Sequence, residues 1–465
     1  MNVQNARRGA PAALLAGLLL FTAVPALAAT GAAPGDSTAA PTAPLPVLTL
    51  SQCVDIALHS SLAIASAAAQ REQAAAGVTG AYGGFMPSVS LSAQGSKNQH
   101  TDLDATLPGG GVGDNTFSST SSSYGASSSL NVFDGMRKFG NLSSARASLE
   151  AADASAGYTR EQVVVNVASA YFNLLRYERL LEVAIETRDL AGKELDRMDV
   201  YFKLGSAARS DVLSANVRHE QTKLDVVRAQ NSVEQAFANL AYAMNRPLAD
   251  RFEIERDAMA TDFSLGQLDA LYAEALEKRL DLQSREHNLE AAHGNFIAAQ
   301  AGLWPSLDLF GSYSHSKNES PYRFGAQKAD DLSWGYRVSW SIFDRLQTWS
   351  GRSQARAQER AADYQLQQAR LDAQLEVRQI FNSLIEARER ASLSRETITQ
   401  AEEALRLAEE RFRVGAGTTL DTITAQVNLA KARSDEVQAV CDYLINAAAL
   451  DRAVGRAVRY LGSGS

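Results

Sequence analysis

The sequence is internally duplicated, and this repeat restricts the possible folds more than any other feature. Three segments recur in order: GFMPSVSL at 84–91 matches GLWPSLDL at 302–309, SLNVFDG at 129–135 matches SWSIFDR at 339–345, and YFKLGSAARSD at 201–211 matches RFRVGAGTTLD at 411–421. The last two pairs share one offset, because 210 residues separate both Phe133 from Phe343 and Gly205 from Gly415. A common offset argues against chance likeness between alanine-rich helices. We therefore expect a first repeat at 49–262 and a second repeat at 263–456.

The amino-terminal residues have the pattern of a secretory signal, which we predict at 1–28. Arg7 and Arg8 precede an apolar run, and Ala26-Leu27-Ala28 supplies the small residues before a cleavage site. The alternative is a retained membrane anchor, but no stop-transfer flank follows the apolar run. Residues 29–48 are Pro/Ala-rich, and we expect a disordered lead-in there; 457–465 is a carboxy-terminal tail.

The charge balance argues against a nucleic-acid partner. Without Arg7 and Arg8 the mature chain has 43 basic residues against 53 acidic ones, a net charge of −10. Binding to phosphates requires a basic face. We therefore expect no contact with nucleic acid.

Two segments, about 85–133 and 305–343, have the pattern of strand pairs. Between Ser333 and Ile342 large apolar side chains alternate with small or polar ones over about ten residues, the length and period of a transmembrane barrel strand. The polar stretches 97–118 and 315–331 are predicted to be the hairpin loops. The aromatic residues of a membrane interface are predicted to be Trp304, Trp334, Tyr336, Trp340 and Trp349. A soluble β-sandwich is the alternative, but the rest of the chain offers no second sheet.

Four strands cannot close a membrane barrel by themselves. Such barrels need about eight strands or more, because an open edge in lipid leaves backbone groups without hydrogen bonds. The sequence therefore predicts an oligomer, in which two chains would supply about eight strands and three about twelve.

The remaining chain is predicted to be helical, with long helices at 135–204 and 345–413 and return helices at 207–244 and 418–455. Apolar residues at three- and four-residue steps mark coiled-coil seams. The predicted seams are Val164, Val167, Tyr171, Leu174, Glu178, Leu181 and Ile185; Val377, Phe381, Leu384, Arg388 and Ala391; and Ile423, Val427, Ala430, Ser434, Val437, Cys441 and Leu444. Helices of this length would extend about 100 Å. They would form either a tube or a solid bundle.

Both cysteines are predicted to pack rather than react. Cys441 lies on the last seam, and Cys53 lies in a helical segment well past the apolar run of the signal, so it is not a lipidation site. No spacing between the two supports a disulfide.

No catalytic constellation is apparent. The histidines show no metal-ligand spacing with Cys, Asp or Glu, and neither a phosphate-binding glycine loop nor a nucleophile motif occurs. The six residues are His59, His100, His219, His287, His293 and His315. We therefore expect no enzyme, no cofactor and no metal site.

The two turns 203–211 and 413–421 join the long helices to the return helices. Gly205 and Gly415 suit the residue that ends a helix. Thr418 and Asp421 have the spacing of a capping box, and Asp211 has the equivalent place on the first tip. Capping alone would explain both acids, so their presence does not yet indicate a function.

Taken together, the duplication, the FDGMRKFG/FDRLQTWS segments and the tip pattern [RY]-F-x-[VL]-G…D resemble the TolC-like outer-membrane efflux and secretion proteins. The resemblance covers about 50–456. It implies a mainly α-helical fold with a β-barrel part. In the homotrimer, four strands per chain complete a barrel of twelve in outer-membrane lipid, above a helical tunnel through the periplasm. It also implies an inner-membrane ABC transporter and a periplasmic adaptor as partners.

The resemblance further implies that the hairpin tips form the periplasmic entrance. The aromatic position of the family's entrance falls on Phe412, and the first acidic position falls on Asp421. Ser210 and Asp211 match the Thr-Asp pair that the family has on the first tip. Three Asp421 carboxylates around the axis would narrow the entrance and favour cations.

Two tip positions depart from the family pattern. Gly417 stands where the family has an arginine, and Thr424 stands at the second acidic position. These departures put the usual latch in doubt. Arg413 is a candidate replacement for the missing arginine.

Within the family, the chain resembles the branch that serves type I protein secretion rather than the lipid-anchored drug-efflux branch. The expected cargo is a protein toxin of the adenylate cyclase (cyclolysin) or RTX type. Multidrug efflux is the first alternative. A non-conducting periplasmic coiled-coil adaptor is the second, but it needs no paired membrane-type strands.

Overall fold

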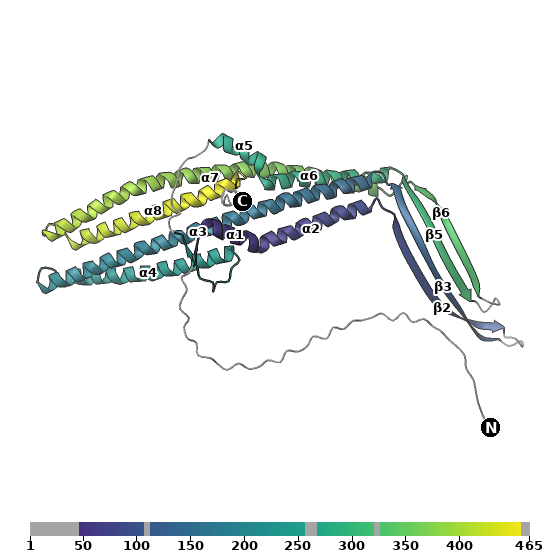
Figure 1. Cartoon of the computed structure of the whole chain (residues 1–465), viewed down its shortest axis with the longest axis horizontal. Helices are drawn as coiled ribbons and strands as arrows, with labels where there is room; N and C mark the ends of the chain where they lie inside the picture. Colours follow the sequence, from purple (N-terminus) through teal and green to yellow (C-terminus); the bar gives the residue numbers. More distant parts are fainter. Residues whose placement is uncertain (1–45, 107–111, 256–266, 320–325, 457–465) are drawn as a thin grey trace, which may run out of the picture. The chain divides into compact units, whose positions relative to one another are not determined.

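The helices and strands occur in nearly the same order in both repeats of the computed structural model (Figure 1). The structure describes residues 46–106, 112–255, 267–319 and 326–456. The first repeat contains α1 (Leu50–Ser60), α2 (Leu62–Gly83), β2 (Ser88–Thr106), β3 (Val112–Phe133), α3 (Arg137–Lys203) and α4 (Arg209–Ala243). The second contains α5 (Leu268–Lys278), α6 (Leu280–Ala299), the 3-10 turn η1 (Ala301–Leu303), β5 (Ser306–Glu319), β6 (Gln327–Ser339), α7 (Gln347–Arg413) and α8 (Thr419–Ala453). The mainly helical fold expected from the sequence is confirmed.

Three of the four pairs of corresponding helices have equal lengths, and α2 and α6 differ slightly, with 22 and 20 residues. The pair α1 and α5 has 11 residues each, α3 and α7 have 67 each, and α4 and α8 have 35 each. The predicted signal, most of the predicted lead-in, the boundary at 262/263 and the tail 457–465 lie outside the described residues. The repeat boundary therefore stays a prediction.

The turn from each strand pair into its long helix uses the same backbone. Gly135 and Met136 are both left-handed, with φ of 70° and 75°, and Arg345 and Leu346 repeat this with 58° and 66°. A side chain on Gly135 would collide with the backbone of Ala301, so glycine is required in the first repeat. The duplication thus extends to an uncommon backbone conformation.

The long helices pack against neighbours along much of their length. Helix α3 contacts α2, α4, α6 and α8, while α7 contacts α5, α6 and α8; Figure 1 shows the α3–α4 and α7–α8 hairpins extending in the same direction. With 67 residues, each long helix extends about 100 Å. The main apolar cluster joins α1, α3 and α4, with Val54, Tyr171 and Leu240 fully buried.

The predicted seams of α3, α7 and α8 are buried or half-buried, with one exception in α8. Val427 is 40% exposed, whereas Ala425, Leu429 and Ala432 on the same helix are buried. The prediction of Val427 as a seam residue is therefore wrong. Cys53 and Cys441 are both buried and free, as their predicted packing role requires.

The strands form one antiparallel sheet in the order β2-β3-β5-β6, so the two repeats join at the β3–β5 pair. The predicted loops 97–118 and 315–331 are too long, because pairing continues to Thr106 and Val112 in one hairpin and to Asn318 and Gln327 in the other. Strands pair through backbone groups whatever their side chains, so the polar serine, threonine and asparagine side chains of these segments led to the wrong prediction. Elsewhere, β1 (Val47–Leu48) pairs in parallel with β4 (Glu253–Ile254).

Within residues 46–106, 112–255, 267–319 and 326–456, no helix combines the length and the apolar character that crossing a membrane requires.

Candidate functional site

The two hairpin tips share one turn geometry. After α3, the Ser206 amide donates to the Tyr201 carbonyl (2.9 Å) and the Gly205 amide to the Phe202 carbonyl (3.0 Å). After α7, Ala416 and Gly415 make the same bonds to Arg411 (2.8 Å) and Phe412 (3.0 Å). This is a Schellman turn with a left-handed glycine, with φ of 76° at Gly205 and 75° at Gly415. The predicted role of both glycines is confirmed.

The two tips differ in how their return helices are capped. At α8 the Thr418 amide and hydroxyl both donate to Asp421 Oδ2 (2.8 Å each), and the Asp421 amide donates to Thr418 Oγ1 (3.3 Å). At α4 the residue corresponding to Thr418 is Ala208, whose amide donates to Asp211 (3.1 Å), so only half of the box exists. The hydrogen bonds from Thr418 hold the pKa of Asp421 below its usual value. Asp421 is therefore an exposed, firmly ionised carboxylate.

The tips contact each other within one chain. The rings of Tyr201 and Phe412 have centroids 5.8 Å apart, and the Thr419 hydroxyl lies 3.6 Å from Met198 Sδ, where it can donate a weak hydrogen bond. Phe412 itself has no hydroxyl, but it packs on a tyrosine that has one. An aromatic contact thus joins the ends of α3 and α7.

The other predicted entrance residues are present at the tips but are not joined into a latch. Arg413 and Ser210 are exposed, and Thr424 donates to its own helix at the Leu420 carbonyl (2.7 Å). A Cβ on Gly417 would lie 3.1 Å from Arg411 Cβ, so this turn leaves little room for a side chain. Among the described residues of one chain, no hydrogen bond joins Ser210 or Asp211 to the second tip. Their roles at an entrance stay predictions.

A buried acid below the tips could not be found from the sequence. The side chain of Glu194 on α3 is 2% exposed; it lies 3.2 Å from Arg197 Nη1, yet neither carboxylate oxygen has a hydrogen-bond partner. Burial raises the pKa of Glu194, and the Arg197 guanidinium only partly offsets this. A single Glu inside an amphipathic helix gives no signal of its burial, because burial depends on which helices pack against α3.

The sheet at the other end of the long helices has two unlike faces. One face carries serine pairs joined by hydrogen bonds, such as Ser90–Ser127 (2.7 Å) and Ser312–Ser333 (2.8 Å). The other face is apolar, and its large side chains are exposed: Val89, Leu91, Tyr124, Leu309, Tyr313, Leu332, Trp334, Tyr336 and Val338. No described element of the chain covers this face.

The predicted interface aromatics gather around the second strand pair. Trp334 and Tyr336 lie on β6, 83% and 73% exposed. Trp304 precedes β5, while Trp340 follows β6 and Trp349 lies in the first turn of α7; these three are 60%, 60% and 67% exposed. All five are accessible, and their contact with lipid stays a prediction.

One histidine lies between two acids, although the sequence predicted no metal-ligand site. His287 Nδ1 lies 3.0 Å from a carboxylate oxygen of Glu290 on α6 and 3.3 Å from one of Glu150 on α3. The three-residue spacing of His287 and Glu290 was visible in the sequence. The contribution of Glu150 was not, because it comes from the other repeat.

Comparisons with known proteins point to one family. The family model described as "Outer membrane efflux protein" matches residues 53–246 and 271–456. "Outer membrane protein TolC" of Vibrio cholerae is 24% identical over 394 residues, which cover 84% of this chain and 86% of the relative. "Protein CyaE" of Bordetella pertussis is 25% identical, covering 88% and 84%. "Alkaline protease secretion protein AprF" of Pseudomonas aeruginosa is 22% identical, covering 61% and 59%.

A solved structure has the same fold. The outer-membrane channel OprN superposes with a TM-score of 0.76 at 22% identity, and the match covers 87% of this chain and 89% of that one.

Proposed function

The chain belongs to the outer membrane efflux protein family, and from this premise we propose that it forms, as a homotrimer, a passive exit duct for type I secretion of a protein. Members of the family are outer-membrane channels of the TolC and OprN kind. Placement in the outer membrane follows from membership, while the trimer, the cargo and the partners are proposals.

The observation that carries the proposal is the two-faced sheet. Its apolar face is exposed and its other face is lined with serine, the alternation of a barrel with lipid outside and water inside. Its outer strands, β2 and β6, have no further neighbour among the described residues. In lipid their free backbone groups must find partners. If β6 of each chain pairs with β2 of the next, three chains close a barrel of twelve strands.

The helices continue this barrel as a tunnel. Each chain supplies two hairpins, α3–α4 and α7–α8, with many alanines buried between them. Small residues permit close packing of helices at a modest angle. Six such hairpins around an axis would enclose a tube through the periplasm and place the tips with Asp421 and Asp211 at its entrance.

The direction of transport and its energy must come from partners. We expect an inner-membrane ABC transporter and a periplasmic adaptor to meet the duct at the tips. The cargo class is supported by the name of one relative, a protease secretion protein. The family's own description, efflux, supports the alternative that the duct exports drugs.

Deletion of the gene separates the two cargo classes. Loss of one or a few secreted proteins, such as an RTX-type toxin, with unchanged drug tolerance is expected. Increased drug sensitivity with an unchanged set of secreted proteins would instead favour the efflux alternative. The complementing strain should carry the intact chain, and a strain carrying Asp421→Asn serves to test the entrance in the same assay.

A further inference from the structure

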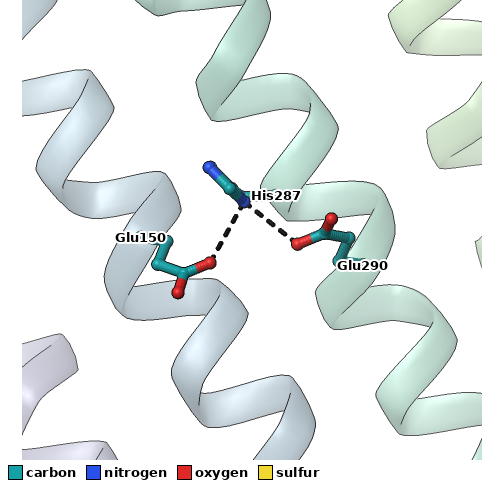
Figure 2. A group of neighbouring side chains, drawn as sticks. All are labelled: Glu150, His287 and Glu290. Atoms are coloured by element: carbon teal, nitrogen blue, oxygen red, sulfur yellow. Dashed lines mark hydrogen bonds and ion pairs between the residues drawn. The ribbon is translucent and has the colours of Figure 1, made fainter.

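A side-chain cluster between the two repeats has the composition of a metal site. Figure 2 shows Glu150 on α3 facing His287 and Glu290 on α6. His287 Nδ1 lies 3.3 Å from Glu150 Oε2 and 3.0 Å from Glu290 Oε2. The other ring nitrogen points away from both carboxylates (Figure 2). One nitrogen and two carboxylates thus converge on one small volume.

These distances match those between ligands of a tetrahedral ion. Zinc lies about 2.0–2.1 Å from histidine nitrogen and about 2.0–2.2 Å from carboxylate oxygen. Two such ligands at the tetrahedral angle are about 3.3 Å apart. The two nitrogen–oxygen distances here are 3.0 and 3.3 Å, and the three ligand atoms all lie within 4.8 Å of one another. We propose that Glu150, His287 and Glu290 bind a divalent transition-metal ion of the zinc type, with water in the fourth position.

The backbone around the cluster is held tightly enough to keep the ligands in place. Helices α3 and α6 touch at two glycines: a Cβ on Gly140 would lie 2.7 Å from the Gly294 carbonyl oxygen, and one on Gly294 would lie 2.6 Å from the Ser144 amide nitrogen. On the other side of the cluster, the Ser284 hydroxyl donates to the Ala151 carbonyl (3.0 Å). The cluster therefore lies between two fixed contacts, and the backbone needs little rearrangement when the ion binds.

An ion can reach the cluster from solvent. The side chains of Glu150 and Glu290 are 58% and 62% exposed, and both line an open groove of about 830 Å³ between α3, α6 and α7. With Glu359 and Asp363, four acids line the groove against two arginines, Arg146 and Arg360, so its net charge is negative and attracts cations. Bound metal would tie the first repeat to the second through α3 and α6.

Direct binding to the full-length oligomer in detergent, purified without a polyhistidine tag, tests the proposal. Calorimetry with Zn²⁺ alone should show one ion per chain. Glu150→Gln and His287→Gln each remove a ligand from a different helix and should weaken binding by about tenfold or more. Cobalt in place of zinc should give tetrahedral visible absorption bands that shift in both variants.

His293→Gln is the matched control. His293 also lies on α6 and contacts one carboxylate, Glu359 (2.7 Å), but is not part of the cluster. The His293→Gln variant should bind zinc with the same affinity as the unchanged chain. The proposal is overturned if the unchanged chain binds no zinc, or if Glu150→Gln and His287→Gln bind it as tightly as His293→Gln; the three residues would then form only a hydrogen-bonded triad.

Discussion

Arg279 offers the sharpest test of how the helices of the second repeat are held together. It lies between α5 and α6, its side chain is 7% exposed, and it reaches three parts of the chain. Its guanidinium donates to both oxygens of Asp281 (3.0 and 2.8 Å), to Glu376 on α7 (2.6 Å) and to the Ala453 carbonyl at the end of α8 (3.3 Å). Burial alone would raise the pKa of Asp281, but the bonds from Arg279 outweigh it and lower that pKa.

Arg279→Met removes this charge while keeping most of the side-chain volume. Breaking a buried ion pair from one side costs about 3–5 kcal/mol. The side chains of Asp281 and Glu376 are 30% and 28% exposed and can partly rehydrate, so we expect about 3 kcal/mol, the lower end. The contribution of Asp281 is complete above about pH 4, its unfolded pKa, and is lost as the pH falls through its lowered folded pKa. The difference in free energy of unfolding between the original chain and Arg279→Met should therefore become smaller in acid.

Denaturant unfolding followed by far-ultraviolet circular dichroism measures this effect. Tryptophan fluorescence would not report on it, because all four tryptophans lie in or beside the second strand pair. Arg370→Met is the matched control: Arg370 contacts Glu286 at 2.7 Å, but the side chains are 48% and 44% exposed, so at most about 1 kcal/mol is expected. Equal midpoint shifts in Arg279→Met and Arg370→Met would refute the reasoning.

Three further predictions concern the tips and the assembly. Asp421→Asn keeps a capping oxygen but removes the charge, so it should lower the cation selectivity of single channels. Thr418→Ala removes the cap and should leave the selectivity unchanged. The reverse result would reduce Asp421 to a capping residue. Glu194→Gln should stabilise the protein at neutral pH. The pKa of Glu194 is raised in the folded chain, so the free energy of unfolding falls as the pH rises above about 4.3, the pKa of an unfolded glutamate. Thermal unfolding should show a higher melting temperature for the variant at neutral pH and no difference near pH 4.3. The detergent-purified chain should run as an oligomer on unheated gels and as a monomer after boiling, and a stable monomer before heating would contradict β6-to-β2 pairing between chains.

The parts of the fold that follow from local chemistry were predictable. The left-handed glycines at 205 and 415 and the capping box at Thr418 have short-range signals, and so have the ends of the long helices. The sheet was recognised from the alternation in β6, but its extent was not, because serine-rich strands look like loops. A strand's polar face carries no information about where pairing stops.

The parts that depend on contact between the repeats could not be predicted. The Tyr201–Phe412 pair, buried Glu194 and the Glu150–His287–Glu290 cluster each need side chains from distant segments. In α8 the predicted seam residue Val427 is exposed, and the buried contacts nearby are made by Ala425, Leu429 and Ala432. Sequence thus located the tips and the sheet, while three-dimensional packing selects which side chains meet.

Conductance in a planar lipid bilayer tests the central claim most directly. The purified chain should insert and give discrete current steps, with cation selectivity that depends on Asp421. Protein that associates with the bilayer and passes no ions under any voltage would contradict a duct and favour the non-conducting adaptor.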